Sequence, residues 1–447
     1  MNKFINLFFL FFLIELSATS KTVGDITVIP ERVTVDAAIP ERVTVDAAWC
    51  WFSDPRAVYH KGMHEKIYYG YINRKGDVRV NSYDLQTGEE ETFVLHSELE
   101  VDDHNVPTFL FLPDGKLLTF YNHHNGHIFM RRSKYAESVR EWEEEKVILE
   151  KDSLNRYCYT NPVMLSGENN RIYLFGRNIV RNKLGAYTDT RIYSIYSDDY
   201  GETWSKEINL FDNQGRNTPQ YVKYASDNQS RIDFLFTDGH PKQDAAISVY
   251  HMYYQNGKFW QTDGEKICSY NDAPVVIAKV DKVYDAVKHG VRGWIWDIAL
   301  DKKNRPVVTY ARYPSEMEHQ YHYARWNGKE WKDTKVTDAG NYITIVKPGK
   351  KLLEAHYSGG IVLDHNNPQT VFLSRKIGDR FELEKRIMGK NGKYQTFPLT
   401  QSSPKDNLRP YVIYGKNIGN PILMWMEGFY YHYTDYETDI RMMEVDK

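Results

Sequence analysis

Short apolar runs alternate with polar turns along nearly the whole chain after Trp49. Within each run, aromatic and β-branched residues recur at alternate positions, and Gly, Asn and Asp bound the runs on both sides. Apolar stripes at helical spacing are nearly absent. The pattern therefore predicts an all-β chain.

The strand-like runs form units that resemble one another. Each unit has an apolar strand, a turn, a second strand and then a polar outer hairpin. The chain contains seven such hairpins, for example YDLQTGEEETFVL and ARWNGKEWKDTKV. Repeats about 50–70 residues long with four strands each predict a seven-bladed β-propeller of four-stranded antiparallel blades. A β-sandwich would not explain seven repeats.

Two local features support this fold. The sequence from Ser197 to Trp204 matches the S-x-D-x-G-x-T-W turn motif, the Asp-box of sialidase-type propellers. The segment from Trp425 to Met443 is expected to close the ring with an N-terminal strand, which removes exposed sheet edges. Neither feature identifies a chemistry.

The N-terminus predicts export. Lys3 precedes an apolar run from Phe4 to Leu16, and small residues follow. This arrangement is typical of a secretory signal peptide (residues 1–20), since a spanning helix needs ~20 apolar residues. We expect a secreted or periplasmic protein with no membrane insertion.

The sequence IPERVTVDAA then occurs twice, at 29–38 and 39–48. We expect one copy to form the first strand and the other an extended lead. The predicted domains are a lead at 21–48 and the propeller at 49–447.

The amino-acid composition narrows the classes of molecule that the protein could bind. Aromatic residues make up 14% of the chain, mostly as 34 Tyr, and the net charge is -3. A near-neutral surface does not indicate nucleic-acid binding, and an anionic polymer would need local arginines instead. Cys50, Cys158 and Cys268 are too scattered for a disulfide framework or a CxxC metal site, so buried thiols are expected.

Histidines cluster at the two ends of one predicted hairpin. The turn LPDG at Leu112–Gly115 folds the segment back on itself, which places His104 opposite His124 and Asn125. The next hairpin places Tyr159 opposite Arg177.

A third hairpin brings Tyr221 and His240 to the same end. Any one of these residues could be an ordinary core or surface residue, and Asp102 and Asp103 could be turn or capping residues. Their coincidence in three successive blades predicts a ligand site on one face of the propeller axis.

The predicted set favours one reaction class. It lacks a carboxylate pair placed for glycoside hydrolysis and a nucleophile with an adjacent base. Imidazoles, phenols and a guanidinium suit β-elimination on a uronic acid, in which a base removes the C5 proton, arginine neutralises the carboxylate and an acid protonates the leaving oxygen.

Several segments carry a resemblance to a known family: WCWFSDPRAVYH, DDHNVPTFLFLPDGKLLTFY, YTNPVMLSGENNRIYLFGRN, YVKYAS and FTDGHP. From about Trp49 to the C-terminus the chain resembles the BNR-repeat seven-bladed propellers that include ulvan lyases and rhamnose–glucuronate lyases. Related proteins in that group are assigned as α-L-rhamnosidases.

The resemblance implies catalytic roles for five residues. His104 and His124 would be the catalytic histidine pair, and Arg177 would neutralise the uronate carboxylate. Tyr159 would be a base or acid, and Tyr221 would assist proton transfer or binding. Which of His104, His124 and Tyr159 is base and which is acid stays open. Further substrate contacts are expected from Asn105, His123, Asn125, His240 and Lys223.

The chain departs from the family at two places. Some ulvan lyases hold a structural zinc through Cys and His near FTDGHP, but here the segment from Tyr250 to Tyr254 has no Cys. No metal ligands and no cofactor for the chemistry are therefore expected, while a structural divalent cation in the channel remains allowed. The rhamnosidase relatives have a His near the WCWF motif where this chain has Ser53.

We therefore expect a monomeric, secreted polysaccharide lyase that cleaves rhamnose–uronic acid linkages of an acidic, sulfated polysaccharide such as ulvan. The alternatives are an α-L-rhamnosidase that acts on glucuronate-containing glycans and a non-catalytic glycan-binding propeller. The expected partner is an acidic polysaccharide or oligosaccharide, with no nucleic acid.

Overall fold

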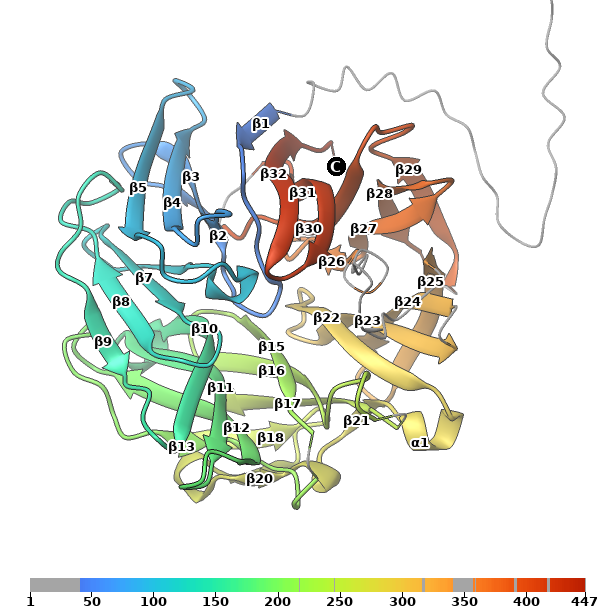
Figure 1. The fold of residues 1–447 in the computed structure, drawn as a ribbon. Coiled ribbons are helices and arrows are strands. Elements are labelled where there is room, and N and C mark those ends of the chain that lie inside the picture. The colour runs from blue at the N-terminus through green and yellow to red at the C-terminus, as the bar shows by residue number, and fades with distance from the viewer. Residues whose placement is uncertain are drawn as a thin grey trace, which may run out of the picture.

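Seven antiparallel sheets surround a central axis in the computed structural model, and each lies with its first strand innermost (Figure 1). The structure describes residues 41–216, 218–244, 246–315, 318–340, 357, 359–389, 392–415 and 419–446. The predicted seven-bladed β-propeller is confirmed.

The first four blades follow one another along the chain. Blade 1 contains β2 (Ala57–Lys61), β3 (Glu65–Ile72), β4 (Val78–Asp84) and β5 (Glu90–His96). Blade 2 contains β6 (Thr108–Phe111), β7 (Leu117–Asn122), β8 (Ile128–Arg132) and β9 (Lys146–Leu149). Blade 3 contains β10 (Asn155–Leu165), β11 (Arg171–Arg181), β12 (Tyr187–Ser197) and β13 (Ile208–Asn209). Blade 4 contains β15 (Tyr221–Ser226), β16 (Arg231–Thr237), β17 (Val249–Gln255) and β18 (Lys258–Gln261), extended by β19 (Lys266–Ser269) and β21 (Lys282–Tyr284).

The last three blades complete the ring. Blade 5 contains β22 (Arg292–Leu300), β23 (Pro306–Ser315), β24 (Glu318–Trp326) and β25 (Trp331–Gly340). Blade 6 contains β26 (Ile361–Leu363), β27 (Thr370–Ile377), β28 (Arg380–Met388) and β29 (Tyr394–Pro398). Blade 7 contains β30 (Asp406–Val412), β31 (Ile422–His432), β32 (Asp435–Glu444) and β1 (Glu41–Thr44).

The remaining elements are short. They are β14 (Phe211–Asp212), which pairs with β20 (Val275–Val276), the helix α1 (Ala286–His289), and the 3-10 turns η1 (Asp103–Asn105), η2 (Ser166–Glu168), η3 (Tyr270–Asp272) and η4 (Ile277–Lys279). Across the described part of the chain, no helix has the length and apolar character that crossing a membrane would require.

The N-terminal strand closes the ring, as the sequence predicts. β1 lies antiparallel to β32, and the backbone N–H of Ala47 donates to the carbonyl of Thr438. β1 belongs to the second copy of the duplicated segment, so the propeller begins inside the segment expected to be a lead, before Trp49. The first copy and the predicted signal peptide lie outside the described residues, and those expectations stay predictions.

The core explains why the blades stay together. One large cluster of buried apolar residues joins the inner strands around the axis and includes Trp49, Trp294 and Trp296. Smaller clusters fill the spaces between blades 1 and 2, 2 and 3, 3 and 4, and 6 and 7. All three cysteines are free thiols; Cys50 and Cys158 are buried and Cys268 is half-buried.

The Asp-box forms the turn that its sequence predicts. Asp199 accepts hydrogen bonds from the hydroxyl of Ser197 (2.8 Å) and from the backbone N–H of Thr203 (2.9 Å). Gly201 adopts φ +90°, a left-handed conformation that favours glycine. The motif fixes the outer edge of blade 3, away from the axis.

The tandem copies allow a matched test of ring closure. Because the two copies are identical, deletion of either one leaves a full copy joined to Trp49, and the thermal unfolding midpoint should not change. Deletion of both removes β1 and the buried side chain of Val43, and should lower the free energy of unfolding by about 2 kcal/mol or more. Equal midpoints for the single and double deletions would contradict this account of closure.

Candidate active site

Two imidazoles stack at the inner end of blade 2. Leu112 and Gly115 form the expected tight turn, and β6 pairs with β7 in the register Thr108↔Phe120. Continued past the strand ends, this register places His104 beside His124. The two rings are parallel within 9°, with centroids 3.9 Å apart.

One carboxylate holds both rings. Asp102 Oδ1 lies 2.6 Å from Nδ1 of His104, and Asp102 Oδ2 lies 2.8 Å from Nδ1 of His124. The same side chain accepts the backbone N–H of His104 at 2.9 Å as the N-cap of η1. The capping role that the sequence allowed for Asp102 is therefore present, together with contacts to both histidines. Since a carboxylate only accepts, each Nδ1 carries a proton and each Nε2 faces away from Asp102.

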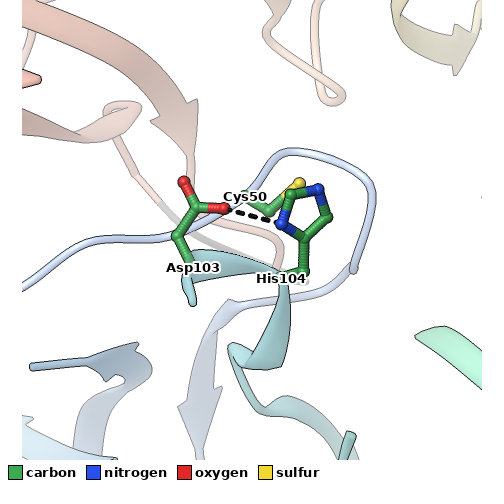
Figure 2. Close-up of side chains that lie close together, drawn as sticks. All are labelled: Cys50, Asp103 and His104. Carbon is green, nitrogen blue, oxygen red and sulfur yellow. Dashed lines mark ion pairs between the residues drawn. The ribbon is translucent and has the colours of Figure 1, made fainter. Parts of the chain in front are cut away.

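A second carboxylate, that of Asp103, holds in place the turn that carries His104. Asp103 Oδ1 lies 3.2 Å from His104 Nδ1, while Asp103 Oδ2 accepts from Arg409 (2.5 Å) and from the hydroxyl of Tyr430 (2.5 Å). Figure 2 shows this carboxylate directed at the His104 ring, with the thiol of Cys50 beside the ring. Blade 7 thus anchors a turn that belongs to blade 2.

Tyr159 reaches the site from a bulge in β10. The register between β10 and β11 shifts between Cys158 and Asn161, and Tyr159 adopts φ +67°. A bulge turns a side chain out of the regular alternation. Gly176 lies opposite, where any side chain would collide with the Tyr159 carbonyl. The Tyr159 ring lies 5.6 Å from the His104 ring.

Arg177 is a buried cation without a counter-ion among the described carboxylates. Its side chain is 3% exposed, and its Nε makes no hydrogen bond. The guanidinium carbon lies 4.8 Å from the ring centre of Tyr159 and 5.0 Å from that of Tyr221. All three residues line one pocket. A buried guanidinium left unpaired in this way is suited to bind an anion.

Blade 4 contributes the last two side chains of the candidate site, Tyr221 and His240. The ring of Tyr221 lies 6.1 Å from Tyr159 and 5.4 Å from His240, and both Tyr221 and His240 pack against Trp294. Trp294 is fully buried. Nε2 of His240 lies 3.2 Å from the hydroxyl of Tyr357. The structure therefore brings residues from three successive blades into one continuous surface.

The two stacked histidines differ in charge. Burial disfavours charge on His104, but the Asp102 carboxylate outweighs it and, with help from Asp103, raises the pKa of His104 well above its usual range. Burial and the neighbouring charge of His104 lower the pKa of His124, against the pull of Asp102. These opposite shifts favour an imidazolium at His104 and a neutral imidazole at His124.

Burial also sets the protonation state of Tyr159 and of His240. It raises the pKa of Tyr159 well above its usual range, so the phenol keeps its proton. Burial, with the charges of Lys242 and Arg177, lowers the pKa of His240 to about 3, so this ring stays neutral.

Four of the predicted substrate contacts lie outside the group formed by His104, His124, Tyr159, Arg177, Tyr221 and His240. Asn105 donates to Glu100, the His123 ring packs against His127 and Phe129, and Asn125 occupies the turn at φ +79° with its N–H bound to the carbonyl of Tyr157. Lys223 lies deeper, where its ammonium binds the Asp54 carboxylate and the carbonyl of Trp51.

Sequence reasoning missed one contact of the histidine pair. The Tyr433 ring lies edge-on to both rings, 5.0 Å from His104 and 5.3 Å from His124, and its carbonyl accepts the backbone N–H of Asp103. Tyr433 comes from the turn between β31 and β32, and no spacing in the sequence relates it to blade 2.

Among the residues that the structure describes, two groups of side chains bring potential metal-ligand atoms within 4.8 Å of one another: Cys50, Asp103 and His104, and Asp102, His104 and His124. Both contain His104, whose Nδ1 already binds carboxylates. Burial also raises the pKa of the Cys50 thiol, whereas a metal requires a thiolate. The donor set fits a proton-holding network better than a cation.

Comparison with solved structures agrees with the fold. An ulvan lyase of polysaccharide lyase family PL25, bound to -[GlcA(1-4)Rha3S]-, superposes with a TM-score of 0.69 over 90% of this chain and 94% of that one, at 15% identity. A second structure of a PL25 ulvan lyase gives a TM-score of 0.68 over 91% and 96%, again at 15% identity. At this identity the likeness establishes the fold alone.

No curated protein matches the sequence significantly. The family model of the BNR repeat-containing proteins matches residues 66–339, which is more than half of the chain. Together with the seven blades and the Asp-box, this match shows that the chain belongs to the BNR repeat-containing family.

Proposed function

We propose that the protein is a polysaccharide lyase that cleaves rhamnose–uronic acid linkages by β-elimination. The observation that carries the proposal is Arg177, a buried guanidinium without a carboxylate partner among the described residues, placed beside proton donors and acceptors from three blades. The substrate would be an acidic, sulfated polysaccharide such as ulvan. Export by the N-terminal segment would bring the enzyme to such a polymer.

Arg177 would bind the uronate carboxylate. The C5 proton is weakly acidic because its removal places a second negative charge on the carboxylate group. A guanidinium can form two parallel hydrogen bonds to that group and disperse the charge. Because the site is buried, this attraction is little screened by water.

The unequal charges of the histidines support an assignment of base and acid. Nδ1–H of His124 donates to Asp102, which leaves the Nε2 lone pair of this neutral ring free to take the C5 proton. The imidazolium of His104 cannot accept a proton and would instead stabilise the developing enolate. The protonated phenol of Tyr159, beside His104 and Arg177, would donate to the leaving O4.

Glycoside hydrolysis fits the same residues less well. It requires two carboxyl groups that flank the scissile bond, one of them free to attack or to activate water. Here Asp102 is occupied by two imidazoles, and Asp103 by Arg409 and Tyr430. Both carboxylates are almost completely buried.

The product distinguishes the candidate functions. Incubation with ulvan should generate unsaturated uronate ends, which are detected by the ultraviolet absorbance of the new C4–C5 double bond. Released rhamnose without this absorbance would indicate an α-L-rhamnosidase. Retained binding without new chain ends would indicate a glycan-binding propeller, and either result would overturn the proposal.

Replacement of Arg177, the proposed clamp that binds the uronate carboxylate, should lower turnover. Arg177→Ala should lower kcat/KM by ~10²–10³, since one lost donor to a developing oxyanion costs about 3 kcal/mol. Arg177→Lys keeps the charge but loses the paired geometry and should fall in between. The matched control is Arg171→Ala, which removes an arginine at the far end of β11 that pairs with Asp198. Turnover by Arg177→Ala that equals the control would refute the clamp.

The pH profile tests the charged histidine. The raised pKa of His104 means that its imidazolium persists below that pKa and is lost as the pH rises through it. Asp102→Asn keeps an oxygen for the cap but removes the charge, so the His104 pKa should fall and the alkaline limb of kcat/KM should move to lower pH. Asp114→Asn, in the exposed turn of the same hairpin, should leave the profile unchanged. An unmoved alkaline limb in Asp102→Asn would refute the charged state of His104.

A further inference from the structure

A second cavity lies at the propeller axis, and it shares no lining residue with the pocket formed by Tyr159, Arg177 and Tyr221. A small cavity is enclosed by the innermost strands β15, β22, β26 and β30 and by the segment that precedes β2. Figure 1 shows these strands converging on the axis. The cavity has room for roughly one water-sized occupant. A sugar or a sulfate is therefore too large for it.

The cavity carries four buried donors that make no hydrogen bond. They are the indole Nε1 atoms of Trp51 and Trp296 and the guanidinium Nε atoms of Arg56 and Arg409. Each of these side chains is at most 6% exposed. Buried donors without partners are uncommon, because desolvation is not compensated. Four such donors on residues that line one cavity point to an occupant that accepts hydrogen bonds.

The acceptors at the same cavity are already used. Asp54 accepts from Arg56 (2.8 Å) and from Lys223. Asp297 accepts from the backbone N–H groups of Ile298 and Leu363, both at 2.8 Å, and Nε2 of His365 lies 3.1 Å from each of its oxygens. A cation would have to displace these donors.

The charged groups at the cavity leave no carboxylate free for a cation. Asp54 pairs with Arg56 and Lys223, and Asp297 pairs with His365, while Arg409 pairs with Asp103 outside the cavity. The indoles of Trp51 and Trp296 stack at 4.7 Å. Ring edges are the positive part of an aromatic system, so the indole N–H groups suit an acceptor of hydrogen bonds.

We propose that this cavity binds a small monatomic anion, chloride under most natural conditions, through the indole N–H groups of Trp51 and Trp296 and the guanidinium groups of Arg56 and Arg409. The bound anion satisfies the four donors and links the segment that precedes β2 to β22 of blade 5 and β30 of blade 7. It therefore stabilises the folded propeller, whether or not the protein is a lyase.

Unfolding measurements at constant ionic strength test the site. Replacement of sodium gluconate, whose anion is too large for the cavity, by sodium chloride or bromide should raise the thermal unfolding midpoint by a few degrees and saturate. Equal midpoints in chloride and gluconate would mean that the cavity holds water only. Stabilisation by calcium that EDTA reverses, with no halide effect, would mean a cation site. Both results would overturn the proposal.

A matched pair of variants locates the effect. Trp296→Phe keeps a ring but removes one donor, and should weaken the halide affinity roughly tenfold or more. Trp294→Phe is the control, because Trp294 is equally buried, has an unpartnered Nε1 and lies in the same strand, but does not line the cavity. Equal halide stabilisation of both variants would contradict the site.

Crystals of the unaltered protein give an answer even if Trp296→Phe fails to fold. Grown in bromide at a saturating concentration, they should show an anomalous peak in the cavity within hydrogen-bonding reach of both indoles. A cavity without an anomalous peak would overturn the proposal.

Discussion

The bridge that Asp102 forms between His104 and His124 is the interaction on which the candidate site depends. A single buried carboxylate accepts from Nδ1 of both rings and fixes their tautomers. Asp103 lies against His104 and not against His124, which breaks the symmetry of the pair. Asp102, with help from Asp103, raises the pKa of His104, so the proton that the two rings could share belongs to His104. Two chemically identical side chains thereby acquire different capacities, His104 to stabilise negative charge and His124 to take a proton.

The closed propeller holds together side chains that a single hairpin could not bring to one site. The turn that carries His104 is held by Arg409, which lies 306 residues away in the sequence and is itself held by the Trp49 carbonyl. Arg177 and Tyr159 come from blade 3 and Tyr221 from blade 4. Closure by β1 and the apolar clusters between blades fix these distances, because packed interiors yield little. The rigid ring therefore keeps the side chains of the candidate site at the distances that the proposed chemistry requires.

Local sequence signals predicted the parts that depend on local geometry. The LPDG turn defines the register of β6 and β7, and the register alone brings His104 to His124. The same reasoning placed Tyr159 opposite Arg177, whereas the bulge pairs Cys158 with Arg177 and delivers Tyr159 by a different backbone path. Lys223 was expected to contact substrate because its ammonium could bind a sulfate or a carboxylate. Its burial against Asp54 could not be read from the sequence, because Asp54 lies 169 residues earlier in the chain.

Contacts across the ring were beyond the reach of sequence reasoning. Tyr433 and Arg409 approach the histidines from blade 7, and nothing in their local sequence distinguishes them from other propeller residues. The central cavity has the same origin, because its donors come from strands far apart in the chain. The measurement that tests the account most directly is imidazole nitrogen NMR of the protein near neutral pH. The account predicts a doubly protonated His104 and a neutral His124 with its proton on Nδ1. Two neutral rings, or two charged ones, would contradict it.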